Sequence, residues 1–279
     1  MLQIVIPAFN EERRLPRTLR ELRRHVAART AVGVGRVEVV VVDNASTDRT
    51  AEVARAPDSA ALPVRVVHCG VRGKGAAVRA GLLATDADLV CFMDADGATA
   101  LDAIDAAWAR IQAGADVVIG SRGLAESATE ARHCRTRSLG AAAYRRFAGR
   151  LIPGIADTQC GFKMFRGELV REVVRDLRSS GFAFDVELLV RLSAVGARVE
   201  ELPVTWVDVP GSTFVPARHG ASAFAELATI AWRTRPLRTA APLAKLPRTP
   251  TTRPVALPAG LSTALVIPIV VSTLADLHE

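Results

Sequence analysis

Two carboxylates, one residue apart, follow directly on an apolar run in the first half of the chain. The run is Leu89-Val90-Cys91-Phe92-Met93, and the acids lie in Asp94-Ala95-Asp96-Gly97. Residues i and i+2 of an extended segment point the same way, so both acids reach the carboxyl edge of a sheet together. Two adjacent like charges are unfavourable unless a cation neutralises them, and a divalent ion shared with a substrate phosphate does this well. The pattern predicts a metal–diphosphate site. A solvated Asp-rich turn is the alternative, and the buried strand in front disfavours it.

Other polar residues also follow apolar runs. Asn10, Asp43 and Ser121 each come after a predicted strand, and ligands of open α/β sheets bind at the carboxyl ends of the strands. Together with Asp94 they predict one composite site. Lys74 opens a predicted helix after glycines, a usual place for a phosphate; a plain exposed lysine is the alternative.

The elements that must position these residues alternate between strand and helix. Val37 to Val42 is a nearly continuous β-branched run, as expected for a parallel strand covered on both faces. The alternation predicts an α/β fold with a mostly parallel, right-handed, doubly wound sheet. The predicted strands are 4–6, 37–42, 64–68, 89–93 and 117–119, and the predicted helices are 15–26, 48–56 with Ser46 or Thr47 as cap, 74–84 and 102–112.

The second region, from about residue 123 to 231, is less regular. It opens on a polar, Arg-bearing loop over 121–137, followed by an amphipathic helix that carries Arg145, Arg146 and Arg150 on one face. Downstream, the pattern predicts strands at 162–165 and 199–206 and helices at 168–177 and 186–195.

The end of the chain changes composition. Residues 233–254 are Pro-rich and basic, which predicts a linker, and 255–275 carry no charge. That stretch has about the length of a membrane span, but prolines, a glycine and several Ser/Thr interrupt it. A span or membrane-lying segment and a docked or frayed tail both stay open.

Composition narrows the function classes. The 279-residue chain is about half apolar, has a formal charge of +7 and few aromatic residues. Excess base can indicate nucleic acid, an anionic membrane surface or a phosphorylated substrate, and no nucleic-acid-binding motif is present. The four cysteines have no CxxC spacing, which favours reduced thiols. The first strand starts almost at Met1, so no signal peptide is expected.

Several motifs, in order, resemble the inverting family-2 glycosyltransferases of the GT-A fold. They are Ile6-Pro7-Ala8-Phe9-Asn10-Glu11-Glu12, Val41-Val42-Asp43-Asn44-Ala45-Ser46-Thr47-Asp48 and Asp94-Ala95-Asp96, with Gly73-Lys74-Gly75, Gly120-Ser121-Arg122 and Asp157-Thr158-Gln159-Cys160-Gly161-Phe162-Lys163. The last three look nearest to the polyprenyl- and dolichyl-phosphate β-glucosyltransferases. The resemblance covers about residues 1–215. The chain departs from it in two places. Asn44-Ala45-Ser46 stands where the family often has Asp-Gly-Ser, and Gly211-Ser212-Thr213 stands where relatives commonly carry a Lys or Arg.

The resemblance implies a GT-A fold with a Rossmann-like, mostly parallel sheet, a smaller acceptor-side region and a C-terminal tail. Residues 1–122 would form the nucleotide-sugar-binding half and 123–232 the acceptor-binding half, followed by the linker 233–254 and the apolar tail 255–279. Mg²⁺ or Mn²⁺ would be held by Asp94 and Asp96, and would act as a Lewis acid on the leaving diphosphate. The implied nucleotide-sugar contacts are Pro7, Ala8, Glu11, Asp43, Lys74, Asp94 and Ala95.

The acceptor determines which further residues are needed. A sugar hydroxyl needs a general base, whereas a lipid monophosphate with a second pKa of about 6 is already an anion and needs cations instead. Arginine binds phosphate bidentately, so Arg122 is the first candidate. Asp157 would position the acceptor or a cation, serve as base for a hydroxyl, or only pair with Lys163. The other candidates are Arg132, Arg135, Arg137 and Lys163 for the acceptor phosphate, then Asp185 and Glu187, with His219 expected to be inert.

The function predicted in this way is metal-dependent, inverting transfer of a hexose from a nucleotide sugar to a polyprenyl phosphate at the cytoplasmic membrane face. UDP-glucose is favoured over GDP-mannose by the subgroup resemblance alone. A soluble acceptor hydroxyl, a sugar-nucleotide binding module and a haloacid-dehalogenase-type phosphatase with a nucleophilic Asp94 are the alternatives. A nicotinamide enzyme is disfavoured, because no Gly-x-Gly-x-x-Gly follows the first strand. The expected partners are the donor, the acceptor and a membrane surface, without nucleic acid.

Overall fold

A seven-stranded mixed sheet forms the centre of the fold. The computed structural model describes residues 1–28, 35–55, 62–130, 135–209 and 216–239. The strands lie in the order β3-β2-β1-β4-β7-β5-β8, and β7 is antiparallel to both of its neighbours while the other pairs are parallel. Their bounds are β1 Leu2–Ala8, β2 Val37–Asp43, β3 Val64–His68, β4 Leu89–Met93, β5 Val117–Ser121, β7 Phe162–Arg166 and β8 Val199–Pro203. The predicted, mostly parallel α/β sheet is confirmed.

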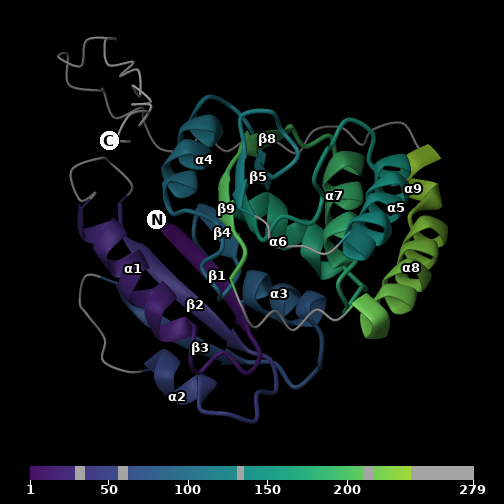
Figure 1. The fold of residues 1–279 in the computed structure, drawn as a ribbon. Helices are drawn as coiled ribbons and strands as arrows, with labels where there is room; N and C mark the ends of the chain where they lie inside the picture. The colour runs from purple at the N-terminus through teal and green to yellow at the C-terminus, as the bar shows by residue number, and fades with distance from the viewer. Residues whose placement is uncertain (29–34, 56–61, 131–134, 210–215, 240–279) are drawn as a thin grey trace, which may run out of the picture. The chain divides into compact units, whose positions relative to one another are not determined.

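Helices cover both faces of this sheet (Figure 1). Alternate side chains of β4 enter two different apolar clusters: Val90 and Phe92 on one face, Cys91 and Met93 on the other. The second face is covered by α1, α2 and α4, and the first by α3 and α5 to α8. The helices are α1 Leu15–Ala28, α2 Thr50–Arg55, α3 Lys74–Leu83, α4 Asp102–Gln112, α5 Arg135–Leu151, α6 Gly167–Arg175, α7 Phe184–Ala194, α8 Pro216–Arg233 and α9 Arg235–Thr239.

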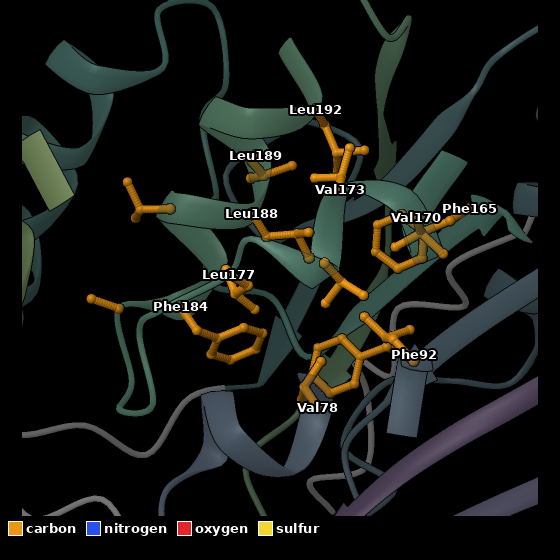
Figure 2. Packing of buried hydrophobic residues seen from close by; sticks show 14 of the residues in the cluster. Val78, Phe92, Phe165, Val170, Val173, Leu177, Phe184, Leu188, Leu189 and Leu192 are labelled. Carbon is orange, nitrogen blue, oxygen red and sulfur yellow. The ribbon is translucent and has the colours of Figure 1, made fainter. Parts of the chain in front are cut away.

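The apolar cluster that contains Phe92 includes the end of β4, two residues before Asp94. The Phe92 ring packs edge-on against Phe184 of α7, with ring centroids 5.9 Å apart. Figure 2 shows both rings close to Val78 of α3. The helical layer thus packs against β4 up to Phe92, two residues before the first of the two acids.

Three local predictions are wrong in detail. Residues 199–206 form two strands rather than one, because the chain leaves the large sheet after β8 and pairs as β9 (Thr205–Val207) with β6 (Ala128–Glu130). The helix expected at 48 begins at Thr50, whose backbone N–H donates to Asp48 Oδ1 at 2.9 Å, so Asp48 rather than Ser46 or Thr47 accepts from the first turn. The start of the predicted linker 233–254 is helical, because α9 covers Arg235–Thr239 and Thr234 is fully buried, and 240–254 lies outside the described residues.

The predicted apolar tail, 255–279, lies outside the described residues. Among those described, no helix combines the length and apolar character needed to cross a membrane.

Candidate active site

Asp94 and Asp96 lie where β4 ends. The backbone N–H of Asp94 donates to Gly161 O at 3.0 Å, and the Asp96 carboxylate accepts from Ala98 N at 3.0 Å. Burial raises the pKa of Asp96, and the neighbouring charge of Asp94 raises it further. The two acids are therefore a pair of close anions that a cation would stabilise.

Glu11 belongs to the same charged cluster. It is buried and paired with Arg14, with Arg14 Nε 2.7 Å from Glu11 Oε2. Burial raises the pKa of Glu11; Arg14 opposes this, and the charges of Asp96 and Asp94 add to it. Thr18 Oγ1 donates to Ala95 O at 2.7 Å, so the segment that carries Glu11 and Arg14 lies against the residue between the two acids. Arg14 was missed from the sequence, although its i+3 spacing from Glu11 is a usable signal.

Asp43 ends β2 and is largely buried. Its Oδ1 accepts from Ser46 N at 3.2 Å and its Oδ2 lies 3.1 Å from His68 Nδ1. The turns beside it are unusual, because Asn10 and Ala45 both have positive φ, at 56° and 54°. Pro7 and Ala8 end β1 next to this turn, and the N–H of Asn44 donates to Ala8 O at 2.9 Å. The structure thus brings these predicted donor contacts together.

The Lys74 side chain reaches the first of the two acids, Asp94. Its Nζ lies 2.8 Å from Asp94 Oδ1 and 3.0 Å from Asp94 Oδ2. Burial opposes the charge of Lys74, but Asp94 and Asp185 outweigh it and raise the lysine pKa. The lysine is therefore a fixed ammonium beside Asp94.

The amino end of α3 is closed by protein rather than open to a phosphate. The N–H groups of Gly75 and Ala76 donate to Gly181 O at 3.1 Å and to Ser180 O at 3.2 Å. A Cβ at Gly73 would lie 2.2 Å from Ser180 O, so the glycine is required by this close approach. The predicted phosphate site at the helix terminus is thus corrected, since these donors are already used, and Lys74 can act only through its ammonium.

Arg122 and Asp157 form an ion pair. Arg122 Nε lies 2.7 Å from Asp157 Oδ2, Nη2 lies 3.0 Å from Oδ1, and the N–H groups of Arg122 and Gln159 each donate to the carboxylate at 3.1 Å. Burial works to raise the pKa of Asp157, but the hydrogen bonds and charge of Arg122 lower it below its usual value. The Asp94 N–H donates to Gly161 O at 3.0 Å, so the segment that carries Asp157 adjoins the two acids, and the charge of Asp94 helps to raise the pKa of Arg122.

Lys163 lies elsewhere than expected. It is fully buried opposite Phe92 in the β4–β7 register, and its Nζ lies 2.5 Å from Asp185 Oδ1. It neither pairs with Asp157 nor reaches the surface, so it is not placed to contact an acceptor phosphate. The side chain enters the helical layer because Lys163 and Phe92, as directly opposed residues, project from the same face of the sheet.

The two acids of α7 are structural rather than open to a ligand. Both lie in the first turn of the helix α7, Phe184–Ala194. Glu187 is fully buried, pairs with Arg191 at 2.8 Å and accepts from Ser179 N at 2.8 Å. Asp185 pairs with Lys163.

The remaining predicted acceptor residues are only partly placed. Arg132 lies outside the described residues, as does Gly211-Ser212-Thr213, and Arg135 and Arg137 are in the first turn of α5. His219 lies on α8 rather than in the expected loop.

The donor set fits a divalent ion that is shared with a substrate. Two carboxylates one residue apart offer oxygen ligands, and Mg²⁺ is usually held by one or two carboxylates with phosphates and water. Within the described ranges, no three His, Cys, Asp or Glu side chains form a metal cage of their own. The pair can therefore hold a metal only together with other ligands, as a diphosphate would provide.

Comparison with known proteins identifies the family. The family model "Glycosyl transferase family 2" matches residues 3–174. The chain belongs to this family. It is a glycosyltransferase, and the alternative of a phosphatase with a nucleophilic Asp94 is thereby overturned.

Two curated relatives illustrate the likeness of this family-2 enzyme. The dolichyl-phosphate beta-glucosyltransferase ALG5A of Trichomonas vaginalis is 34% identical over 218 residues, covering 76% of this chain and 67% of the relative. The human dolichyl-phosphate beta-glucosyltransferase is 32% identical over 229 residues, covering 77% and 70%. The predicted resemblance to this subgroup is confirmed.

The fold of this glycosyltransferase also matches solved structures. Glucosyl-3-phosphoglycerate synthase from Mycobacterium tuberculosis superposes with a TM-score of 0.60 at 18% identity, covering 83% of this chain and 80% of that chain. The likeness confirms the predicted GT-A fold.

Two further residues of the site were not found from the sequence. Gly161 lies against Asp94, where a Cβ would come within 2.0 Å of Oδ2. Trp206 of β9 makes a cation–π contact with Arg122, whose guanidinium carbon lies 5.4 Å from the ring centroid. Gly161 is part of a quoted motif, whereas Trp206 carries no local signal because β9 is brought there by a separate small sheet.

Proposed function

We propose that this family-2 enzyme transfers a hexose, with inversion, from a nucleotide sugar to a polyprenyl phosphate, and that UDP-glucose is the donor. The acceptor is supported by the relatives of this chain, which are dolichyl-phosphate beta-glucosyltransferases. The donor and a divalent ion are supported by a fold neighbour, glucosyl-3-phosphoglycerate synthase, solved with Mn²⁺ and UDP-glucose.

The observation that carries the proposal is the state of Asp157. A useful general base has a pKa near the working pH, whereas Asp157 is held by four hydrogen bonds that keep its pKa low. A hydroxyl acceptor would gain little from such a carboxylate. A phosphate monoester needs no base because it arrives as an anion, so an ionic Arg122–Asp157 pair suits an anionic acceptor.

Each residue then has a physical role. Asp94 and Asp96 would hold Mg²⁺ or Mn²⁺, which as a Lewis acid supplies stabilisation of charge on the leaving diphosphate. Lys74 adds a fixed positive charge at the same edge. Asp157 orients the Arg122 guanidinium, which meets the acceptor phosphate, and Asp43 and Glu11 contact the nucleoside. Arg132, Arg135 and Arg137 remain proposed contacts of the acceptor.

A membrane surface is part of the proposal, at the cytoplasmic face. Trp232, at the end of α8, is 77% exposed, and the exposed basic residues Arg233, Arg235 and Arg238 follow it. Exposed Trp beside basic side chains suits an interfacial position on anionic lipid. The apolar stretch 255–275 would add to this attachment.

The experiment is nucleoside diphosphate release from UDP-glucose and from GDP-mannose, with Mn²⁺ or Mg²⁺, with and without a short polyprenyl phosphate. We expect release from UDP-glucose that needs the lipid and that a chelator abolishes. Turnover that is independent of the lipid but supported by a sugar hydroxyl would refute the acceptor assignment. Turnover with GDP-mannose alone would refute the donor assignment.

The membrane part is tested by vesicle flotation. With phosphatidylglycerol vesicles, Trp232→Ala combined with Arg233→Glu and Arg235→Glu should reduce the bound fraction relative to the wild type. An unchanged fraction would show that this surface does not contribute to attachment.

A further inference from the structure

A buried pair of opposite charges lies beneath the two site acids. Lys163 is fully buried, its Nζ lies 2.5 Å from Asp185 Oδ1 and it donates to Cys160 O at 2.8 Å. Asp185 is likewise buried, at 3% exposure. Two ions removed from water are costly even when paired, and neutral side chains of similar volume often replace such a pair without loss of stability.

The pair lies close to Lys74. A Cβ added to Gly75, the residue after Lys74, would lie 2.6 Å from the Cβ of Phe184, the residue before Asp185, so the two charged side chains start from adjoining ends of α3 and α7. Both lysine ammonium groups lie 5.6 Å from the centroid of the Phe92 ring. The ring itself is fixed between α3 and α7 (Figure 2), so the lysines are positioned around a rigid element.

The charges therefore alternate from the sheet edge inward. Asp94 pairs with Lys74 and Asp185 pairs with Lys163, and the close approach of Gly75 to Phe184 sets Asp185 next to Lys74. A metal that used the Asp94 oxygens would compete with Lys74 for the same atoms. Asp185 is then the anion that can keep Lys74 in place, and its ion pair with Lys163 favours the charged carboxylate against the burial that raises the pKa of Asp185.

We propose that Asp185 and Lys163 are positioning residues that hold the Lys74 ammonium beside the donor diphosphate once a metal takes over Asp94. The interaction of Asp185 with Lys74 is proposed for the protein without substrate. The place of Lys74 beside the donor diphosphate rests on the proposed function. The role differs from the acceptor contact that the sequence suggested for Lys163.

The first arm of the test needs no substrate. Urea unfolding is measured for the wild type, Lys74→Met, Asp185→Asn and the double variant, and the coupling is taken from the cycle. We expect the effects on the unfolding equilibrium constant to depart from additivity by fivefold or more, or ~1 kcal/mol. Additivity within about twofold, the usual result for independent sites, would overturn the proposal. Should Asp185→Asn not fold alone, the cycle is run with Lys163→Met present throughout.

The second arm measures binding of UDP with Mn²⁺ by calorimetry. Asp185→Asn should weaken binding about tenfold, but by less than about twofold in the Lys74→Met background, because the effect acts through Lys74. The pair variant Asp185→Asn/Lys163→Met should regain thermal stability, since neutral replacement of a buried pair is often tolerated, yet still bind UDP weakly. Recovery of both properties would mean that the pair only supports the fold and would overturn the proposal.

Asp116→Asn is the matched control. Asp116 is also a buried acid in an ion pair, 3.3 Å from Arg166 Nε, but it precedes β5 at the opposite edge of the sheet. We expect it to lower stability without changing UDP binding. If the wild type binds neither UDP nor GDP with Mn²⁺, the proposed donor site fails, and the unfolding cycle alone still decides whether Asp185 holds Lys74.

Discussion

Gly161→Ala should impair the proposed metal site at Asp94 and leave the stability of the fold nearly unchanged. A Cβ on Gly161 would lie 2.0 Å from Asp94 Oδ2 and 2.4 Å from Asp94 Cγ, whereas ordinary contacts begin at 3.4 Å. The carboxylate must therefore move by about 1.4 Å from the position in which it pairs with Lys74, and it can do so by rotation of the Asp94 side chain. The backbone of residue 161 has no positive φ that would add strain.

The expected effect on catalysis is much larger than the expected effect on stability. A misplacement of about 1 Å at a reacting centre can cost ~100-fold in rate, which corresponds to ~2.7 kcal/mol of transition-state stabilisation. We therefore expect kcat/KM of the metal-dependent reaction to fall about 100-fold. The free energy of unfolding should change by less than ~1 kcal/mol, because only the side chain of Asp94 has to move.

The assay pairs chelator-sensitive nucleoside diphosphate release with urea unfolding. Gly149→Ala in α5 is the control, because no atom lies within 4 Å of its added Cβ. Alanine within a helix should stabilise by ~0.5–1 kcal/mol and leave turnover unchanged. Wild-type turnover in Gly161→Ala would refute the reasoning, since it would mean that the position of Asp94 is not important for the metal-dependent step.

Three further changes test other parts of the site. Asp96→Ala should abolish metal-dependent turnover without lowering the melting temperature, because it removes one of two repelling carboxylates; unchanged activity would refute the metal assignment. Asp157→Asn should reduce the free energy of unfolding by a constant amount between pH 5 and 8, measured by urea titration. The pKa of Asp157 is lowered in the folded state, so its stabilisation is present above the unfolded value of about 3.9 and is lost as the pH falls through the folded pKa; a deficit that grew on acidification would contradict this. Gly73→Ala should destabilise by ~1–3 kcal/mol because φ is 125° and the new Cβ meets Ser180 O at 2.2 Å, and it should weaken UDP binding through Lys74; wild-type stability in thermal melts would argue against this packing.

The sequence predicts most of the sheet edge because strand ends are local features. Apolar runs that end in Asp43 or Asp94 locate the carboxyl ends of β2 and β4, and parallel strands place those ends together. The short loop before α3 was also found, but its closure by residues 180 and 181 was not. That contact joins segments about a hundred residues apart, and no local pattern encodes it.

The position of Lys163 could not be predicted for the same reason. Its motif is polar up to Gly161 and then becomes a strand, and a lysine in a strand next to polar residues suggests an exposed ligand. Only the antiparallel insertion of β7 between β4 and β5 sets Lys163 opposite Phe92. Pairing of this kind depends on distant residues, whereas the alternation of apolar side chains shows only that a strand exists.

The inserted strand gives a single motif three different tasks. Asp157 fixes Arg122, Gly161 makes room for the carboxylate of Asp94, and Lys163 pairs with Asp185 below Lys74. A motif that resembles an acceptor-binding segment thus contributes its later residues to the wall of the proposed donor site. Substitutions at Gly161 or Lys163 should therefore change the affinity for nucleotide and metal first, whereas substitutions at Asp157 should change the response to the acceptor phosphate.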